Sequence, residues 1–225
     1  MIKIERTEVF NLEGAIRGAR NPMNSWERSD SRKGCDKCDI PNECFAECPG
    51  GYGFILGTKD LAFARGLIKA GTDHRKFLRQ IFVSVDITAP LYWWKEYDTY
   101  KVGTVSNSCS TMHKIHAKSF ERADFSCDRM SEDALTCLDS VIALLEKQRV
   151  KFVETKELSY WHDMIQLLPS SYNQMRTCTL NYENLLNIYY ARRHHKLMEW
   201  HTLCDWILTL PYFPEMCLGG ETDSE

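Results

Sequence analysis

The chain has 225 residues, of which 44% are hydrophobic and 26% are charged, with a formal net charge of −3 at pH 7. This profile is typical of a globular protein with a sizeable core, and it excludes a strongly basic nucleic-acid binder. No apolar run approaches the ~18–20 residues that span a bilayer, and the opening residues lack the apolar stretch of a signal peptide. We therefore expect a cytoplasmic protein that binds neither nucleic acid nor membranes.

The first part of the chain shows the periodicities of strands and helices in turn. Residues 2–10 alternate apolar and polar side chains, as a half-exposed strand does. An apolar stripe at helical spacing in residues 58–70 predicts a helix capped by Thr58. Residues 80–88 are β-branched and apolar, so they predict a central strand. Pro90 then suits the start of a helix with a strongly aromatic face.

The rest of the chain reads as mainly helical. A helix is expected to begin at Ser131, because its hydroxyl and the two acids that follow satisfy free backbone amides. The other expected elements are a helical piece at 111–120, a helix at 157–168, an extended piece at 175–181, and helices at 181–193 and 196–210. We expect one domain, 1–225, with a Cys-rich inserted loop at about 21–55 and a frayed acidic tail at 218–225.

Common catalytic signatures are absent from the sequence. It contains no Gly-rich dinucleotide loop after a strand, no GxxxxGK[ST], no HExxH and no GxSxG. This excludes the commonest nucleotide-binding and hydrolase assignments.

The order of elements in residues 61–113 is the most informative feature. A helix ending in Lys-Ala-Gly is followed by an apolar strand, an Ala-Pro step, an aromatic helix and a loop of small polar residues. This order resembles the flavin-dependent thymidylate synthases. In that family an Ala-Pro step precedes an Ala-Arg-Gln-Trp helix and an Arg-His-Arg…Asn-Glu-x-Ser-x-Arg-Tyr signature.

A second segment, LLPSSYNQMRTCTLNYENLLNIYYARRHHKLMEW, resembles the same family independently. It is similar to the family's run from Leu-Pro through Asn-Leu-Arg-x-Leu-Leu-His/Asn to Leu-Arg. The residues at matching spacing are Asn181, Leu185, Leu186, Asn187 and Arg192. The two segments occur in the family's order and together cover roughly half of the chain.

The signature itself departs from the family at its arginines. In place of Arg-His-Arg the chain has Thr99, Tyr100 and Lys101 without a gap, or Tyr100, Lys101 and Val102 with one inserted residue. The family's arginines hold phosphate and reduced flavin through a fixed fork of donors. Lys101 supplies a charge but not this bidentate geometry.

The two alignments also differ over the remaining signature residues. With the gap, Asn107 and Ser110 match the family's Asn and Ser; without it, Asn107 falls at Glu and Cys109 at Ser. In either alignment the last Arg of the signature is lost, and Met112 or Thr111 stands there.

The resemblance implies an α/β (α+β) fold, with a central sheet flanked by helices, and a homotetramer. It implies reductive methylation of dUMP to dTMP, with methylenetetrahydrofolate as carbon donor, reduced FAD as hydride donor and NADPH to reduce the flavin. The implied substrate-binding residues are Arg192, Ser110, Lys101, Glu96 and Arg79, and the implied cofactor-binding residues are Asn107, Asn181, Asn187 and His74. No protein nucleophile is expected.

Each of these residues also has a structural interpretation. Arg192 and Arg193 could simply complement the dipole at a helix end, and Asn181 could be a helix cap. Glu96 replaces the family's Gln, so it only accepts hydrogen bonds where Gln also donates, which would alter the base that is accepted. The aromatic group of Trp93, Trp94 and Tyr97 is expected in the core, although such rings also stack on ligands.

Two further clusters leave alternatives open. Cys109, His113 and His116 have a spacing that could hold a metal on a helix, and Cys109 could act as a nucleophile, although ordinary surface roles are commoner. The loop cysteines Cys35, Cys38, Cys44 and Cys48 could form a structural zinc site, remain free thiols, form opportunistic disulfides or hold an iron–sulfur cluster. The five-residue gap between the pairs is shorter than in a standard zinc finger.

Two other functions remain open. One is an enzyme of the same fold that acts on a different pyrimidine nucleotide, as Glu96 and the lost arginines suggest. The other is a non-catalytic nucleotide-binding or interaction protein.

Overall fold

The computed structural model describes residues 2–34 and 53–219. Its strands are β1 (Lys3–Phe10), β2 (Arg32–Lys33), β3 (Phe54–Ile55), β4 (Phe82–Pro90), β5 (Val105–Ser108) and β6 (Asn173–Asn181). Its α-helices are α1 (Leu12–Arg20), α2 (Thr58–Lys69), α3 (Leu91–Tyr97), α4 (Glu132–Thr155), α5 (Leu158–Leu167), α6 (Tyr182–Arg192), α7 (Met198–Ile207) and α8 (Phe213–Cys217). Short 3₁₀ helices are η1 (Asn21–Met23), η2 (Trp26–Arg28), η3 (Arg75–Gln80) and η4 (Arg122–Asp124).

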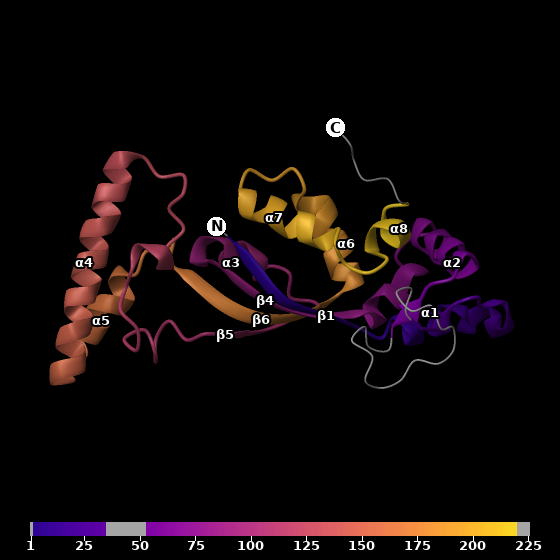
Figure 1. Cartoon of the computed structure of the whole chain (residues 1–225), viewed down its shortest axis with the longest axis horizontal. Helices are drawn as coiled ribbons and strands as arrows, with labels where there is room; N and C mark the ends of the chain where they lie inside the picture. The colour runs from indigo at the N-terminus through magenta and orange to yellow at the C-terminus, as the bar shows by residue number, and fades with distance from the viewer. Residues whose placement is uncertain (1, 35–52, 220–225) are drawn as a thin grey trace. The chain divides into compact units, whose positions relative to one another are not determined.

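A four-stranded sheet with the order β1-β4-β6-β5 is combined with the helices, which confirms the mixed α/β prediction (Figure 1). β2 and β3 form a separate antiparallel pair. The chain divides into two compact units. Unit 1 is Met1–Arg6, Val85–Lys101 and Val105–Cys178, and unit 2 is Thr7–Ser84, Val102–Thr104 and Thr179–Glu225.

In unit 1, α4 and α5 lie side by side as a helical hairpin (Figure 1). Leu145 and Met164, one from each helix, are fully buried between them. Ser131 caps α4 as predicted, because its side chain accepts a hydrogen bond from the amide of Ala134 at 3.4 Å. The aromatic group of α3 is core, as expected: Trp93, Trp94 and Tyr97 are at most 2% exposed.

In unit 2, α6 and α7 pack together, and α2 packs against α8 (Figure 1). Tyr182, at the start of α6, is fully buried, lies edge-on to Phe213 and donates its hydroxyl to the carbonyl of Pro211 at 2.7 Å. The helix predicted at 58–70 is present as α2, but the predicted cap is wrong: Gly57 is the N-cap and Thr58 is the first helical residue. The carboxylate of Asp30 accepts the amides of Lys59 and Asp60 at 2.9 and 3.0 Å, so the capping acceptor comes from another segment.

One predicted element is wrong. Residues 111–120 form a series of turns instead of a helix. The carbonyls of Met112 and His116 accept from Trp161 Nε1 at 3.0 Å and Arg149 Nη1 at 3.5 Å, so contacts with α4 and α5 hold this segment in place of helical pairing. The helical spacing assumed for His113 and His116 therefore does not exist. A second difference is β5, since its residues were expected to form a loop of small polar side chains.

Candidate functional site

Two of the expected ligand-binding residues lie on one cavity of unit 2. The cavity has a volume of about 570 Å³ and is formed by the end of α1, η1, α2 and η3. It is lined by Gly18, Ala19, Pro22, Met23, Leu67, Asp73, His74, Lys76, Phe77, Arg79 and Gln80. Apolar side chains therefore meet the basic groups of His74, Lys76 and Arg79 in one hollow.

The local fold explains why these basic residues face outward. Gly71 has a φ of 105°, which only glycine adopts without strain, and it turns the chain from α2 toward η3. Within η3, Phe77 and Leu78 are buried at 3% and 0% exposure and anchor the short helix to the core. His74, just before the helix, and Arg79 near its end are consequently exposed to solvent.

A carboxylate, Glu183, organises the arginines of this region. Arg79 donates its Nε–H to Glu183 Oε2 in a short contact, and Arg75 donates its Nε–H to Oε1 at 3.3 Å. Arg75 also donates Nη2–H to Asn187 Oδ1 at 3.1 Å. The hydrogen bond to Glu183 raises the pKa of Arg79 above its ordinary value. Arg79 and Asn187, both expected at the ligand site, thus belong to one network.

Glu183 was not among the site residues expected from the sequence. Its position in the first turn of α6 suggests a helix-dipole role, which is common for acids there. Only the burial of its side chain, 10% exposed, and its two arginine partners distinguish it from a surface acid.

Asn181 serves as a helix cap, as the structural interpretation expected. Its side chain accepts the amide of Asn184 at 3.0 Å, and the Asn184 side chain accepts the amide of Asn181 at 3.2 Å. Gly103 lies against this pair with a φ of 75°, and a Cβ there would come within 2.9 Å of Asn181 Nδ2. The close approach requires glycine and fixes the loop Val102–Thr104 on the start of α6.

Arg192 ends α6 and is half-buried. Its guanidinium lies 4.6 Å from the ring centroid of Trp200, which is fully buried. The stacking limits the motion of the guanidinium and favours a fixed orientation of its donors. Arg193 lies instead near the rings of Tyr189 and Tyr190, at 5.7 and 5.5 Å.

The other expected substrate and cofactor residues belong to unit 1. Glu96 is half-buried on α3, Lys101 follows that helix and is exposed, and Asn107 is exposed on β5. Ser110 follows β5, and its hydroxyl oxygen already accepts two backbone amides. Its O–H proton therefore remains the group that Ser110 can offer to a ligand.

Unit 1 also contains an arginine that sequence reasoning missed. The guanidinium of Arg176, on β6, lies 4.2 Å from the ring centroid of Trp94. It donates to Asp98 Oδ1 at 2.7 Å and to Gln174 Oε1 at 3.0 Å, while Gln174 donates to the carbonyl of Cys109 at 2.7 Å. This network ties β6 to the segment that contains the degenerate signature.

A buried thiol and phenol lie beside this network. Burial raises the pKa of Cys178, whose sulfur is 3.3 Å from the hydroxyl of Ser106. Burial also raises the pKa of Tyr97 well above its usual value. Both groups are therefore neutral at pH 7, and neither offers an activated nucleophile.

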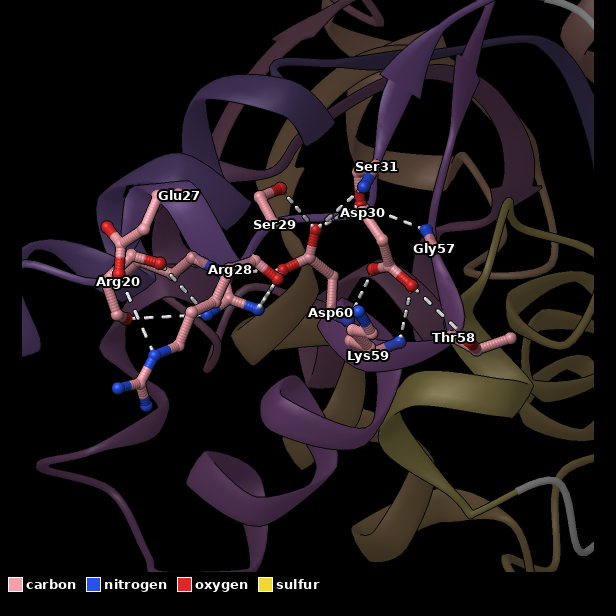
Figure 2. Close-up of polar contacts among 11 residues, drawn as sticks. Arg20, Glu27, Arg28, Ser29, Asp30, Ser31, Gly57, Thr58, Lys59 and Asp60 are labelled. Carbon is pink, nitrogen blue, oxygen red and sulfur yellow. Dashed lines mark hydrogen bonds and ion pairs between the residues drawn. The ribbon is translucent and has the colours of Figure 1, made fainter.

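Unit 2 contains a buried charged network around Arg20 and Asp60 (Figure 2). Arg20 donates Nε–H to Asp60 Oδ1 at 2.6 Å, and Asp60 Oδ2 accepts the hydroxyls of Ser29 and Ser31 at 2.6 and 2.5 Å. Arg20 also donates to the carbonyl of Ser25 at 3.3 Å. Since Arg20 lies between the lining residues of α1 and η1, this network holds one wall of the 570 Å³ cavity in place.

The predicted metal ligands Cys35, Cys38, Cys44 and Cys48 lie outside the described residues. Within 2–34 and 53–219 no group of His, Cys, Asp or Glu side chains is arranged to hold a metal ion. In the same ranges, no helix combines the length and apolar character required to cross a membrane.

No model of a known protein family matches the sequence, and no curated protein sequence does. The fold, however, is similar to solved structures. Thymidylate synthase X from Helicobacter pylori with FAD and dUMP has a TM-score of 0.69 and 16% identity, over 96% of this chain and 97% of that chain.

Two other solved structures are similar as well. A flavin-dependent thymidylate synthase from Helicobacter pylori complexed with FAD and dUMP has a TM-score of 0.65 and 16% identity, over 96% of this chain and 97% of that chain. The UMP/dUMP methylase PolB from Streptomyces cacaoi bound with 5-Br dUMP has a TM-score of 0.62 and 12% identity, over 97% and 95% of the chains. At such identities the similarity shows a common fold.

Proposed function

We propose that this protein is a flavin-dependent enzyme that methylates dUMP to dTMP. Its fold is similar to that of dUMP-bound methylating enzymes over nearly the whole chain, at a TM-score of up to 0.69 in these comparisons. The observation that carries the proposal furthest concerns two residues that the sequence resemblance implies. His74 and Arg79, both expected at the ligand site from the sequence, line one cavity of about 570 Å³.

The lining of this cavity fits a flavin dinucleotide. FAD combines flat ring systems with a diphosphate, so its site needs apolar surface and cationic donors. The cavity offers both, with Ala19, Leu67 and Phe77 among the apolar residues and Lys76 and Arg79 among the cations. Reduced FAD, when bound, would supply the hydride that converts the transferred one-carbon group to methyl.

The protein residues would act by binding and orientation. Arg79, held at Nε by Glu183, would present its terminal amino groups to the diphosphate, and His74 would contact the cofactor beside it. Asn187 accepts from Arg75, so its amide can still donate to the flavin edge. Asn107 and Asn181 are the remaining proposed cofactor contacts.

The nucleotide would be held by charged and hydroxyl groups. In unit 2, Arg192, restrained by Trp200, would pair with the phosphate. In unit 1, Lys101 and Ser110 are proposed as nucleotide contacts through a charge and a hydroxyl proton. Glu96 would accept hydrogen bonds from the base. Methylenetetrahydrofolate would supply the carbon and NADPH would reduce the flavin, and we propose a homotetramer as the working form.

A second candidate is a methylase that acts on another pyrimidine nucleotide, UMP in particular. PolB, of similar fold, is a UMP/dUMP methylase, and the carboxylate of Glu96 in this chain suits a different base edge from an amide. Parallel assays that identify the methylated product from UMP and from dUMP separate the two candidates.

Flavin binding by matched variants tests the cofactor assignment. Titration of the purified chain with FAD should give the absorbance change of a bound flavin. His74→Ala and Arg79→Gln should weaken binding about tenfold or more, the loss of a charged hydrogen bond, while Arg79→Lys should recover part of it. Arg28→Gln, an exposed arginine of unit 2 outside the cavity, is the matched control. Equal affinities for all four variants would contradict the assignment.

A further inference from the structure

Among the described residues, those that line a second hollow in unit 2 are cationic, apolar or aromatic, with one glycine. It has a volume of about 360 Å³ and is formed by α2, α6 and the region of α8. Its lining residues are Arg65, Ile68, Lys69, Arg75, Leu186, Tyr190, Met216, Cys217 and Gly219. None of these is an acid, and this hollow shares no lining residue with the 570 Å³ cavity.

Two of its three cations are held in place by protein acceptors. Arg65 donates Nε–H to the backbone carbonyl of Glu215 at 2.6 Å. Arg75 is bonded to Glu183 and Asn187, and its side chain is 20% exposed. Lys69 lies four residues after Arg65 on α2, so both side chains occupy the same face of that helix. Fixed guanidinium groups lose little entropy when they bind an anion.

The remaining surface of the hollow is apolar and aromatic. Leu186 and Met216 are each 1% exposed and form part of its wall, whereas Tyr190 is 54% exposed. A large aromatic side chain with half of its surface open to solvent suits the stacking of a planar ring. The hollow thus combines a place for an anion with a place for a flat ring.

We propose that this hollow binds a nucleoside monophosphate, at a site separate from the one in the proposed function. The phosphate would lie among Arg65, Lys69 and Arg75, since a dianion matches three cations and the arginine fork matches its oxygens. The base would stack on Tyr190. Because Arg75 also contacts Glu183 and Asn187, the ligand would touch the network that includes Arg79.

Chemical footprinting tests this proposal locally, whatever the enzyme's activity. Lys69 and Lys59 are both exposed on α2, and only Lys69 lines the hollow, so Lys59 is an internal control. The full-length protein is acetylated with increasing UMP, and each lysine is followed by mass spectrometry. UMP should slow acetylation of Lys69 at least fivefold and leave Lys59 unchanged. Uridine should protect neither lysine.

A variant and a simpler anion complete the test. Arg65→Gln should raise the UMP concentration for half-protection about tenfold, as for one lost charged hydrogen bond. Arg28→Gln should leave that concentration unchanged. The absence of protection at Lys69 in millimolar UMP, or undiminished protection in Arg65→Gln, would overturn the proposal. Equal protection by inorganic phosphate would overturn the assignment to a nucleotide. Each result is the acetylation rate of Lys69, which lines this hollow. A failure of this proposal can therefore be told from a failure of the methylase proposal.

Discussion

Arg20 and Asp60 form a buried ion pair in unit 2, with Arg20 Nη2 and Nε at 2.5 and 2.6 Å from Asp60 Oδ1 (Figure 2). Their side chains are 5% and 0% exposed. The carboxylate receives further hydrogen bonds from Ser29 and Ser31, so its charge is matched by donors on several sides. This pair connects the wall of the proposed cofactor cavity to the start of α2.

Removing one partner of this pair should destabilise the protein strongly. Arg20→Met leaves the Asp60 carboxylate buried without its cation, which should lower the free energy of unfolding by about 3–5 kcal/mol. Urea denaturation monitored by circular dichroism measures this loss. Arg28→Met is the matched control, because Arg28 is 78% exposed and its ion pair with Glu27 is 3.7 Å long. The prediction would be refuted if Arg28→Met lowered the free energy of unfolding by more than about 1 kcal/mol, or if Arg20→Met lowered it by less than that.

The same carboxylate should make stability depend on pH. Burial alone would raise the pKa of Asp60, but the hydrogen bonds from Ser29, Ser31 and Arg20 lower it below the usual 3.8. A lowered pKa in the folded state stabilises the fold above the pKa of the unfolded chain, about 3.9. That contribution is lost as pH falls through the folded-state pKa.

The difference in unfolding free energy between the wild type and Asp60→Asn should therefore be constant above about pH 5 and shrink below about pH 4. Denaturation curves recorded at several pH values in one ionic strength measure it. A difference that grows on acidification would show that Asp60 is not stabilised as the anion.

The elements that depend on local pattern could be predicted from the sequence. The apolar run of β4 and the Ser131 cap of α4 are examples, since periodicity and capping are properties of neighbouring residues. His74 and Arg79, which the resemblance implies as ligand-binding residues, line one cavity in the structure, and their role stays a prediction. The series of turns at 111–120 was not predicted because its hydrogen-bond partners are distant in the sequence: the carbonyls of Met112 and His116 accept from Trp161 and Arg149.

Features that depend on distant partners could not be predicted. Asp60 reads as an ordinary acid in the first turn of a helix, yet its partner Arg20 is forty residues away in the sequence. Glu183 has the same local appearance, and Arg75 and Arg79 are more than a hundred residues from it. Arg176 contacts Trp94 and Asp98, and only the fold brings these residues close to it.

Flavin affinity should be low for an enzyme of this fold. The resemblance places two flavin-binding arginines where this chain has Thr99 or Tyr100 and Lys101 or Val102. Each lost charged contact costs about 1.5–3 kcal/mol, so binding should weaken by about two to four decades. FAD should bind in the micromolar range or weaker and separate from the protein on gel filtration. A stoichiometric flavin in the purified protein would show that other residues, Arg79 among them, fully replace the lost arginines.

The nucleotide assignment is tested most simply at Arg192. Arg192→Ala should weaken dUMP binding by about 1.5–3 kcal/mol, since a charged hydrogen bond to phosphate is lost. Isothermal titration calorimetry with wild type and variant measures the change. Arg17→Ala is the control, because Arg17 is an exposed arginine of unit 2 that is not part of the proposed site. Unchanged affinity in a folded Arg192→Ala variant would remove this residue from the site.

Zinc binding by the loop cysteines remains a prediction. If Cys35, Cys38, Cys44 and Cys48 hold Zn²⁺, the purified protein should contain about one zinc per chain, and Cys35→Ser with Cys38→Ser should lose it. Cys137→Ser, a change at an exposed free cysteine, is the control. Elemental analysis that finds no zinc in protein expressed with zinc would exclude the site.

The central claim is that the chain methylates dUMP with a flavin, and product analysis tests it most directly. The purified protein is incubated with dUMP, methylenetetrahydrofolate, NADPH and excess FAD, and nucleotides are separated by liquid chromatography and identified by mass spectrometry. We expect dTMP formation that requires FAD, falls in Arg79→Gln and persists in Arg28→Gln. Bound FAD and dUMP without any dTMP formed would contradict it.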